Sequence, residues 1–525
     1  MLPGTAETRH PQEAIPLRLT WAWWALVALY LLWLGTAPLF DVDEGAFAEA
    51  TREMLASGDW GHTFLNGVDR FDKPILVYWF QAVSMGVFGV NEFAARLPSA
   101  LWTLAAAWQL GRFLRPRWGE STAALAMFMG GSALGVLAIG RAATADGLLN
   151  ALLVLTALSL WQFTESGCRR ALLWAYFWCG LGLLAKGPVA VLVPGGALLI
   201  WSLLSDRGQT AWHAAWAPQG WLLALAVAAP WYLYALHRHG MAFVDGFLLK
   251  HNVERFSSAM EGHGGGIAYY LVVWPLLCLP WAPLMLLVAG RVRLLWADGF
   301  TRFLLVWSLW VLVFFSLSGT KLPHYLLYGT APLLWLMART WLQRPLGSLR
   351  LWAVVVAFVT LLALVAWGAS PWAVQHWADH ISHEGYRELL AKAPPPGWGL
   401  VSVGVLGAIS LAVWGWRGAS LPLRAALSGG IALALLTGAV LPWWGQALQG
   451  PVKTAGLLLR TRAQAATQWQ THQPSVAFYA QTIVPRRAPQ EGEWALTKLS
   501  KGDLPEGYEV AWQSRDLALI RKTAP

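Results

Sequence analysis

Apolar runs near 20 residues long recur along most of this 525-residue chain, and they constrain the fold more than any other feature. A run of about 20 apolar residues is the length of helix that crosses the hydrocarbon core of a bilayer. Hydrophobic residues make up 57% of the sequence and charged residues only 13%, which is the composition of an integral membrane protein rather than of several soluble domains. The sequence therefore predicts an α-helical polytopic membrane protein.

The apolar runs predict about 13 transmembrane helices. The first run follows Arg9 and Arg18 like a secretory signal, but its length and its tryptophans favour an uncleaved span. The spans are expected at approximately residues 20–40, 94–114, 121–139, 146–164, 171–186, 187–204, 219–237, 268–290, 303–317, 324–342, 351–370, 398–416 and 425–444.

Arginine residues alternate with the spans and give the topology. With a cytoplasmic N-terminus, every second connection is basic, and the opposite connection at residues 41–93 carries nine acidic residues against three basic ones. This is the positive-inside pattern. The basic connections contain Arg112, Arg115 and Arg117; Arg169 and Arg170; Arg207; Arg291, Arg293 and Arg302; Arg339, Arg344 and Arg350; and Arg417 and Arg424.

The net charge and the cysteines exclude two other classes of protein. A formal charge of +10 is explained by the basic cytoplasmic face, so no nucleic-acid partner is expected. Cys168, Cys179 and Cys278 lie in or beside apolar runs and have no paired spacing, so they imply neither a disulfide framework nor a zinc motif.

The polar segments on the outer side, away from the cytoplasm, are residues 41–93, 238–267, 318–323, 371–397 and 445–525. The last is expected to be a small soluble α/β domain beside a transmembrane catalytic domain at residues 1–444. It begins with an amphipathic helix at residues 452–469, and strands are predicted at residues 475–480, 494–497, 508–512 and 517–520.

The first outer segment carries the densest cluster of charge, and its first part reads DVDEGAFAEATREMLASGDWGHTFLNGVDRFDKP. Helices are expected at residues 46–55, with Glu49, Arg52 and Glu53 solvated, and at residues 74–88, along the membrane interface. Carboxylates here suit base or metal chemistry and Lys73 suits anion binding. The alternative to an active site is an ordinary solvated loop with acids at the starts of its helices. For Asp43 and Lys73 the sequence leaves both interpretations open.

Two further outer segments hold candidate site residues. Arg255 suits a phosphate clamp and His263 a metal or substrate ligand, whereas the alternative is a basic interfacial loop against lipid head groups. Lys321 and Tyr325 supply a cation and a phenol for a shared site, or they snorkel and anchor at the interface.

Three charged residues lie in two other outer turns. Arg141 and Asp146 are close enough in sequence for a local ion pair. Lys186 precedes a Gly-Pro break between two short apolar runs and faces the outer side, partly buried.

These segments closely resemble bacterial lipid-carrier-dependent glycosyltransferases, relatives of the lipid A aminoarabinose transferase and of the protein O-mannosyltransferases. The resemblance covers about residues 20–345 well and later residues loosely. Its motifs, in the family's order, are DVDEGAFAEATREMLASGDW, LNGVDRFDKPILVYW, NEFAARLPSAL, GRAATADGLL, LLAKGPVAV, KHNVERFSSAMEGHGG and SGTKLPHYLL.

The resemblance implies a GT-C fold with interfacial helices, in the bacterial inner membrane, with its active site facing the periplasm. The implied donor is a sugar on a polyprenyl (undecaprenyl) phosphate, and the acceptor is lipid A or another envelope glycan or protein. A lipid-linked donor agrees with the predicted topology, because nucleotide sugars are unavailable to an enzyme outside the cytoplasm.

The resemblance also implies roles for particular residues. The catalytic positions are Asp43, with Glu44 adjoining it; the donor phosphate is expected at Lys73, Arg255, Lys321 and Tyr325; and a divalent metal ion is expected at Asp72 and His263. Two positions depart from the aminoarabinose transferases and leave the sugar open. Ala46 stands where those enzymes usually carry Arg, and Asp72 replaces Glu in their Glu-Lys-Pro motif.

The expected reaction is a single displacement at the anomeric carbon, in which the lipid phosphate leaves. Lys73 and Arg255 would offset the charge of the leaving phosphate, and Lys321 or a metal ion could add to their effect. Asp43 is the candidate base for a hydroxyl acceptor, whereas a lipid A phosphate acceptor needs little base help. Rival functions are a transporter or flippase of a lipid-linked sugar and a protein O-glycosyltransferase. Transporters place charges or broken helices near the midplane, whereas the charges here gather at one face.

Overall fold

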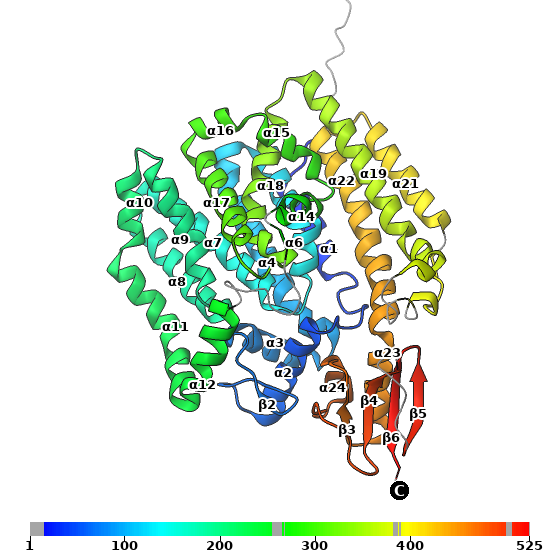
Figure 1. Ribbon diagram of the computed structural model, residues 1–525. Helices are drawn as coiled ribbons and strands as arrows, with labels where there is room; N and C mark the ends of the chain where they lie inside the picture. Colours follow the sequence, from blue (N-terminus) through cyan, green and yellow to red (C-terminus); the bar gives the residue numbers. More distant parts are fainter. Residues whose placement is uncertain are drawn as a thin grey trace, which may run out of the picture.

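The computed structural model describes residues 15–254, 265–266, 268–381, 387, 390–398, 400–499 and 507–523. Its main body is a bundle of apolar helices (Figure 1). The bundle helices are α1 (Leu19–Leu31), α4 (Glu92–Trp118), α5 (Glu120–Ser132), α6 (Leu134–Gly140), α7 (Ala145–Ser166), α8 (Arg169–Lys186), α9 (Val189–Leu203), α10 (Gly208–Ala215), α11 (Pro218–His239), α14 (Tyr269–Leu277), α15 (Met285–Ala289), α16 (Val292–Ala297), α17 (Gly299–Ser316), α18 (Leu327–Leu342), α19 (Leu346–His376), α21 (Leu400–Gly415), α22 (Leu421–Leu435) and α23 (Leu441–Arg462).

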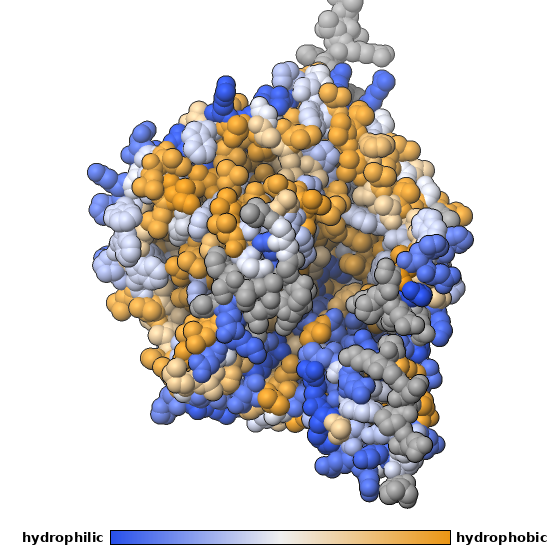
Figure 2. Space-filling view, viewed as in Figure 1, coloured by the Kyte–Doolittle hydropathy of each residue, from blue (hydrophilic) through white to orange (hydrophobic). Residues whose placement is uncertain are grey.

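Each segment predicted as a span contains helix. In the described part of the chain, five helices are long and apolar enough to cross a membrane, or up to six if α5 and α6, bent by 62°, are one span. The five are Ala145–Ser166, Gly208–His239, Gly299–Ser316, Leu346–His376 and Leu421–Arg462. On the face shown in Figure 2, apolar side chains cover much of the middle of the bundle, and polar ones gather at its lower end and along its upper edge.

Contacts between connections agree with the predicted alternation of sides. At one end, Arg117 pairs with Glu165, and the Arg339 guanidinium lies 3.1 Å from the Asp298 carboxylate. At the other end, the Lys453 ammonium lies 2.6 Å from Glu92. Each contact joins connections that the arginine pattern places on the same side.

The outer end is built from α2 (Asp43–Ser57), α3 (Leu76–Phe88), α12 (Met241–Phe243) and a hairpin of β1 (Phe64–Leu65) and β2 (Val68–Asp69), which all lie below the bundle in Figure 1. The helices predicted at residues 46–55 and 74–88 are thus present as α2 and α3. α2 begins with two acids, which favour a helix N-terminus. It ends at Gly58, whose φ of +72° is the left-handed conformation that glycine tolerates.

The prediction that Glu49, Arg52 and Glu53 lie on a solvated face of α2 is wrong, because all three are buried. Glu49 is fully buried and receives two hydrogen bonds of 2.7 Å from Arg52. Glu53 is also buried and accepts the backbone N–H groups of Asn66 and Gly67 in the hairpin loop. These charges are internal because α2 lies between the bundle, the hairpin and the C-terminal segment, which sequence periodicity does not reveal.

A mixed four-stranded sheet lies at the same end, in the order β3-β4-β6-β5, with β3 parallel to β4 and the other pairs antiparallel. Its strands are β3 (Ala466–Gln468), β4 (Trp494–Lys498), β5 (Tyr508–Ser514) and β6 (Leu517–Lys522). Strands predicted at residues 494–497, 508–512 and 517–520 are therefore present. α23 runs out of the bundle and packs under this sheet, so the predicted boundary at residues 444 and 445 falls inside a helix (Figure 1).

The strand predicted at residues 475–480 is wrong, because Ser475–Ala480 forms helix α24. All six of its residues are buried. A short apolar run fits either periodicity, and here packing between α2 and α23 decides the outcome. Two glycines allow this close approach: a Cβ on Gly45 would lie 2.6 Å from the Ser475 nitrogen, and one on Gly456 would lie 2.6 Å from the Tyr479 Cβ.

Candidate active site

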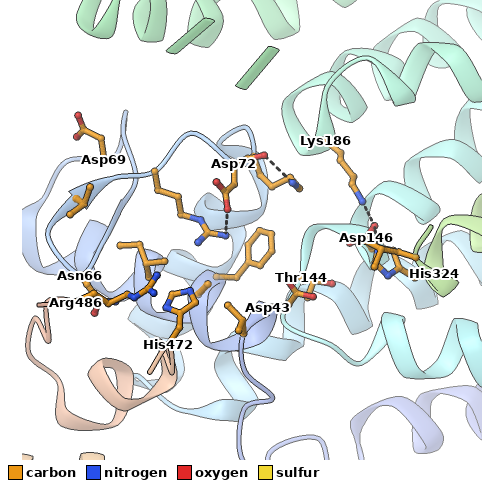
Figure 3. Close-up of a pocket in the computed structure, with 18 of the residues that line it drawn as sticks. Asp43, Asn66, Asp69, Asp72, Thr144, Asp146, Lys186, His324, His472 and Arg486 are labelled. Carbon is orange, nitrogen blue, oxygen red and sulfur yellow. Dashed lines mark hydrogen bonds and ion pairs between the residues drawn. The ribbon is translucent and has the colours of Figure 1, made fainter. Parts of the chain in front are cut away.

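A cavity of about 960 Å³ lies at the outer end, where α2, the hairpin loop, the bundle and the C-terminal segment meet. Figure 3 shows Asp43 between the Asp72 side of the cavity and the side that carries Asp146 and Lys186. The charged and imidazole side chains among its lining are Asp43, Asp69, Arg70, Asp72, Lys73, Asp146, Lys186, His324, His472, Arg486 and Arg487.

Asp43 lines this cavity from the first turn of α2 and is exposed. Asp43 is therefore an accessible acceptor of protons or hydrogen bonds on the floor of the cavity. This is the position expected of the principal catalytic carboxylate.

Glu44, its neighbour, is not among the cavity-lining residues. It is buried and receives two hydrogen bonds from Arg96, of 2.8 and 2.7 Å, and others from the backbone N–H groups of Phe40 and Ala143. Burial alone would raise the pKa of Glu44, but the Arg96 guanidinium and these hydrogen bonds hold it below its ordinary value. Both oxygens of Glu44 are occupied, so in the structure it faces Arg96 and the bundle, and it is absent from the described cavity lining.

Arg70, Asp72 and Lys73 form a charged strip along one side of the cavity. Arg70 lies 3.1 Å from the Asp72 carboxylate and donates to the Tyr78 hydroxyl at 3.2 Å. Burial would lower the pKa of Arg70, but Tyr78, Asp72 and Asp43 keep it above its ordinary value. The Lys73 ammonium donates to the Asp72 carbonyl at 2.9 Å. The strip thus presents two cations beside Asp43.

Lys186 and Asp146 form the facing side. They are joined by an ion pair, the Lys186 ammonium lies 2.9 Å from the Tyr328 hydroxyl, and the His324 imidazole lies 3.6 Å from Asp146. The predicted local pair of Arg141 and Asp146 is wrong. Arg141 instead donates to the carbonyls of Leu29, Tyr30 and Leu32 at the end of α1.

Tyr325 lines the cavity as predicted, and the Lys186 ammonium lies 5.3 Å from the centre of its ring. Lys321 lies elsewhere. It is buried, and its ammonium donates to the carbonyls of Ser316 and Ser318 at 2.9 and 2.7 Å. A cation at the C-terminal end of a helix is favourable, so the structure gives Lys321 a capping role on α17 and leaves it outside the described cavity lining.

The remaining predicted residues, Arg255 and His263, lie outside the described residues. Of the expected metal pair, the structure therefore places only Asp72, on the cavity wall. One of its oxygens faces the Arg70 guanidinium.

The C-terminal segment closes the cavity with His472, Pro485, Arg486 and Arg487. It is held there by Asp41, whose carboxylate accepts hydrogen bonds from the Ser475 backbone N–H at 3.0 Å and from its hydroxyl at 2.5 Å. Burial raises the pKa of Asp41 to about 7, the Ser475 hydrogen bonds oppose that shift, and Glu44 adds to it. The cavity therefore has a basic wall from residues more than 400 positions away from Asp43.

Several cavity residues had little signal in the sequence. Lys186 stands before a Gly-Pro break in the motif LLAKGPVAV, without a role implied for its side chain, and Arg70 is one arginine in an acidic loop. His472 and Arg486 lie in a segment without a recognisable motif. These residues meet because distant segments of the chain pack together, which no local sequence pattern predicts.

Comparison with known proteins places the chain in a family. Residues 72–234 match the model of the dolichyl-phosphate-mannose-protein mannosyltransferases. The undecaprenyl phosphate-alpha-4-amino-4-deoxy-L-arabinose arabinosyl transferase of Erwinia tasmaniensis is 31% identical over 79% of this chain and 74% of its own length. The protein from Sodalis glossinidius with the same name and the suffix 2 is 33% identical over 78% of this chain and 75% of its own length.

The fold agrees with these matches. The crystal structure of ArnT from Cupriavidus metallidurans bound to undecaprenyl phosphate superposes with a TM-score of 0.78, 20% identity and coverage of 96% of this chain and 99% of that one. The apo form gives a TM-score of 0.76. The chain therefore belongs to the family of undecaprenyl phosphate-aminoarabinose arabinosyl transferases, and it is a membrane glycosyltransferase that takes its sugar from a lipid-phosphate carrier.

Proposed function

We propose that this protein transfers a sugar from undecaprenyl phosphate to lipid A, or to another envelope acceptor, at the periplasmic face of the bacterial inner membrane. The observation that carries the proposal is the cavity in which Asp43 lies between two sets of cations, directly below the apolar bundle. A lipid-linked donor can keep its chain in the bilayer while its phosphate enters such a site. The relatives named above are arabinosyl transferases of this kind, which favours transfer over transport.

The donor phosphate is expected to bind cations on both sides of the cavity, Lys73 and Arg70 on one side and Lys186 on the other. In the transfer, the bond between the anomeric carbon and the phosphate oxygen breaks, and its electron pair leaves with the carrier phosphate. Prepositioned cations stabilise that charge as it develops. Tyr325 lies beside Lys186 and offers its phenol to the same phosphate.

Asp43 acts on the acceptor. A new bond forms between an acceptor oxygen and the anomeric carbon, and a hydroxyl acceptor gives its proton to the Asp43 carboxylate. An acceptor phosphate is already an oxyanion and has no proton to give, so Asp43 then orients the sugar. His472, Arg486 and Arg487 supply positive charge on the wall that an anionic acceptor would meet.

Glu44 is assigned a positioning role. Its buried pair with Arg96 holds the start of α2, and hence Asp43, against the bundle. Lys321 has the corresponding task of capping α17 just before the segment that carries His324 and Tyr325.

Asp72 and His263 are the residues proposed to hold a divalent metal ion. Asp72 provides a carboxylate at the cavity, which suits a hard divalent cation, although Arg70 competes for that carboxylate. His263 is the other residue that would hold it. When bound, such an ion supplies positive charge for the leaving phosphate.

Ala46 and Asp72 are the positions that bear on which sugar is transferred. Ala46 lies on the cavity wall one turn after Asp43, where a small side chain leaves room that a bulkier one would occupy. We therefore propose that Ala46 and Asp72 shape the sugar subsite differently from the aminoarabinose enzymes. Mass spectrometry of lipid A and other envelope glycans, with and without the gene, identifies the sugar and the acceptor.

We further propose that the chain spans the membrane about 13 times, with short or bent helices completing the set. The catalytic unit is assigned to residues 1–444 and a periplasmic α/β domain to residues 445–525, with helix α23 running from one into the other and the second unit adding a wall to the cavity.

The decisive experiment is transfer from a polyprenyl phosphate sugar in proteoliposomes. We expect Asp43→Asn to lower the transfer rate by about 10²–10⁴-fold, and Lys73→Ala to lower it by about 10²–10³-fold. Asp206→Asn is the matched control, because Asp206 is exposed and lies in the basic connection at the other end. Full activity in both cavity variants, with normal folding, would contradict the proposal.

A further inference from the structure

A second group of ligand-type side chains lies beside the cavity, where the hairpin loop meets the outer end of α11. It consists of His62, Asp69 of β2 and His239, the last residue of α11. One potential ligand atom from each of the three lies within 4.8 Å of the others. The His62 Nε2 atom is 2.9 Å from Asp69 Oδ1, and the His239 Nδ1 atom is 4.0 Å from Asp69 Oδ2.

We propose that His62, Asp69 and His239 bind a zinc ion that joins the first outer segment to α11. Imidazole nitrogens and a carboxylate oxygen are ligands that zinc takes in tetrahedral sites. Two ligand atoms about 2.1 Å from a tetrahedral zinc ion are about 3.4 Å apart, and the two observed separations, 2.9 and 4.0 Å, lie on either side of that value. Magnesium and calcium are disfavoured, because they prefer all-oxygen ligand sets.

The surroundings of the three side chains favour a bound ion over a simple hydrogen bond. His62 is only 4% exposed, and its ring centre lies 4.0 Å from that of His239. Phe71 packs against both imidazoles, at 5.5 and 5.2 Å between ring centres. The His62–Asp69 hydrogen bond occupies one ring, whereas the His239 Nδ1 atom, 4.0 Å from Asp69, is beyond hydrogen-bond distance from that carboxylate, and an ion between them would complete the contact.

The neighbouring cation does not repel such an ion strongly, because Arg238 is paired with Asp59 at 2.6 Å. Three protein ligands leave a position for water, as the exposed Asp69 side chain allows.

The site is distinct from the predicted pair Asp72 and His263. Asp69 is nevertheless followed directly by Arg70, whose guanidinium contacts Asp72 on the cavity wall. A zinc ion on Asp69 would therefore hold the strip from Arg70 to Lys73 against α11. This consequence rests on the proposed function, whereas zinc binding itself does not.

Zinc binding is tested on the full-length protein in detergent. The protein is stripped with a chelator, reloaded with ZnCl₂, desalted and analysed for metal by mass spectrometry. We expect one class of bound zinc to be lost in His62→Ala and in His239→Ala, and retained in His376→Ala. His376 is the matched control, because it ends another bundle helix, α19, and does not belong to the cluster.

The variant His263→Ala separates the two candidate metal sites. Zinc retained in His263→Ala and lost in His62→Ala supports the proposal, and the reverse pattern overturns it. Cobalt gives a second readout in which His62, Asp69 and His239 are all unchanged. The His263→Ala protein loaded with Co²⁺ should show the visible absorption of a tetrahedral site with nitrogen and oxygen ligands. Absence of that absorption overturns the proposal.

The link to catalysis has its own readout. With the proteins loaded with zinc, His239→Ala should show a higher KM for the polyprenyl phosphate sugar than the wild type, with a smaller loss of kcat, and His376→Ala should change neither. Loss of zinc with an unchanged KM would leave the metal site standing and refute its effect on the strip. A protein that binds zinc as described but transfers no sugar would refute the proposed function alone.

Discussion

At the scale of single residues, adjacent acids in this protein have different tasks. Asp43 is exposed at the cavity, whereas Glu44, one position later, is buried and bound by Arg96. Successive residues on a helix point about 100° apart, so one faces the cavity while the next faces the bundle. The predicted catalytic pair is therefore one cavity carboxylate and one structural carboxylate.

The variant Glu44→Gln should destabilise the fold. Removing one partner of a buried pair leaves an uncompensated charge, which costs about 3–5 kcal/mol. Thermal unfolding in detergent, followed by tryptophan fluorescence, measures the loss. The control is Glu165→Gln, since the pair of Glu165 with Arg117 is partly exposed and is worth at most about 1 kcal/mol. Equal effects of the two variants would refute a structural role for Glu44.

The variant Asp41→Asn should change how stability depends on pH. The pKa of Asp41 is about 7 in the folded protein, chiefly because of burial, against an ordinary value of 3.8, so the folded state binds its proton more tightly. The stability that this proton contributes is complete below about pH 4 and is lost as the pH rises through about 7. Asn resembles the protonated form, so the thermal midpoint of the variant should exceed that of the wild type more at about pH 8 than at about pH 5. The same difference at both pH values would contradict this.

At the scale of elements, the cavity depends on helix α24 lying against α2. Sequence periodicity predicts a strand there, and the helix forms because all six of its residues are buried between two longer helices. The glycines that face α24 let its backbone come close to α2 and α23. This contact brings His472 and Arg486 to Asp43.

The variant Gly45→Ala should separate these elements. Its Cβ would lie 1.9 Å from the Asp41 carboxylate and 2.6 Å from the Ser475 nitrogen, so backbone must move. Overpacking of this kind costs about 1–3 kcal/mol, and we expect a lower thermal midpoint together with weaker transfer. Gly86→Ala in α3 is the control, because no atom lies within 4 Å of its added Cβ, and it should be neutral or stabilising by up to about 1 kcal/mol. Unchanged transfer in Gly45→Ala would show that the contact is dispensable.

At the scale of the whole molecule, the two polar ends differ in charge and in task. The arginine-rich connections contact one another at one end, and the acidic segments gather around the cavity at the other. An apolar bundle separates them (Figure 2). Such a molecule can hold a lipid-linked substrate in the bilayer and react with its head group on one side only.

Cysteine labelling tests this polarity. Cys168 is exposed beside Arg169 and Arg170, whereas Cys179 and Cys278 are buried. A membrane-impermeant maleimide should therefore label the wild type in inside-out vesicles and not in intact spheroplasts. In a Cys168→Ser background, Glu491→Cys should label only in spheroplasts, because Glu491 is exposed near the C-terminal sheet at the other end. Labelling of both positions from the same side would overturn the topology.

The sequence by itself determined the class of protein and the first-loop motif, because hydrophobic length and short motifs are local properties of a chain, and the positions of its arginines predict the side on which each connection lies. It also located Asp43, Lys73 and Tyr325, which line the cavity. Only the tertiary structure decided that Glu44 and Lys321 are internal supports, that Lys186 pairs with Asp146, and that the C-terminal segment supplies a cavity wall. These outcomes depend on contacts between residues tens to hundreds of positions apart, and a local pattern carries no record of which distant segments will pack together.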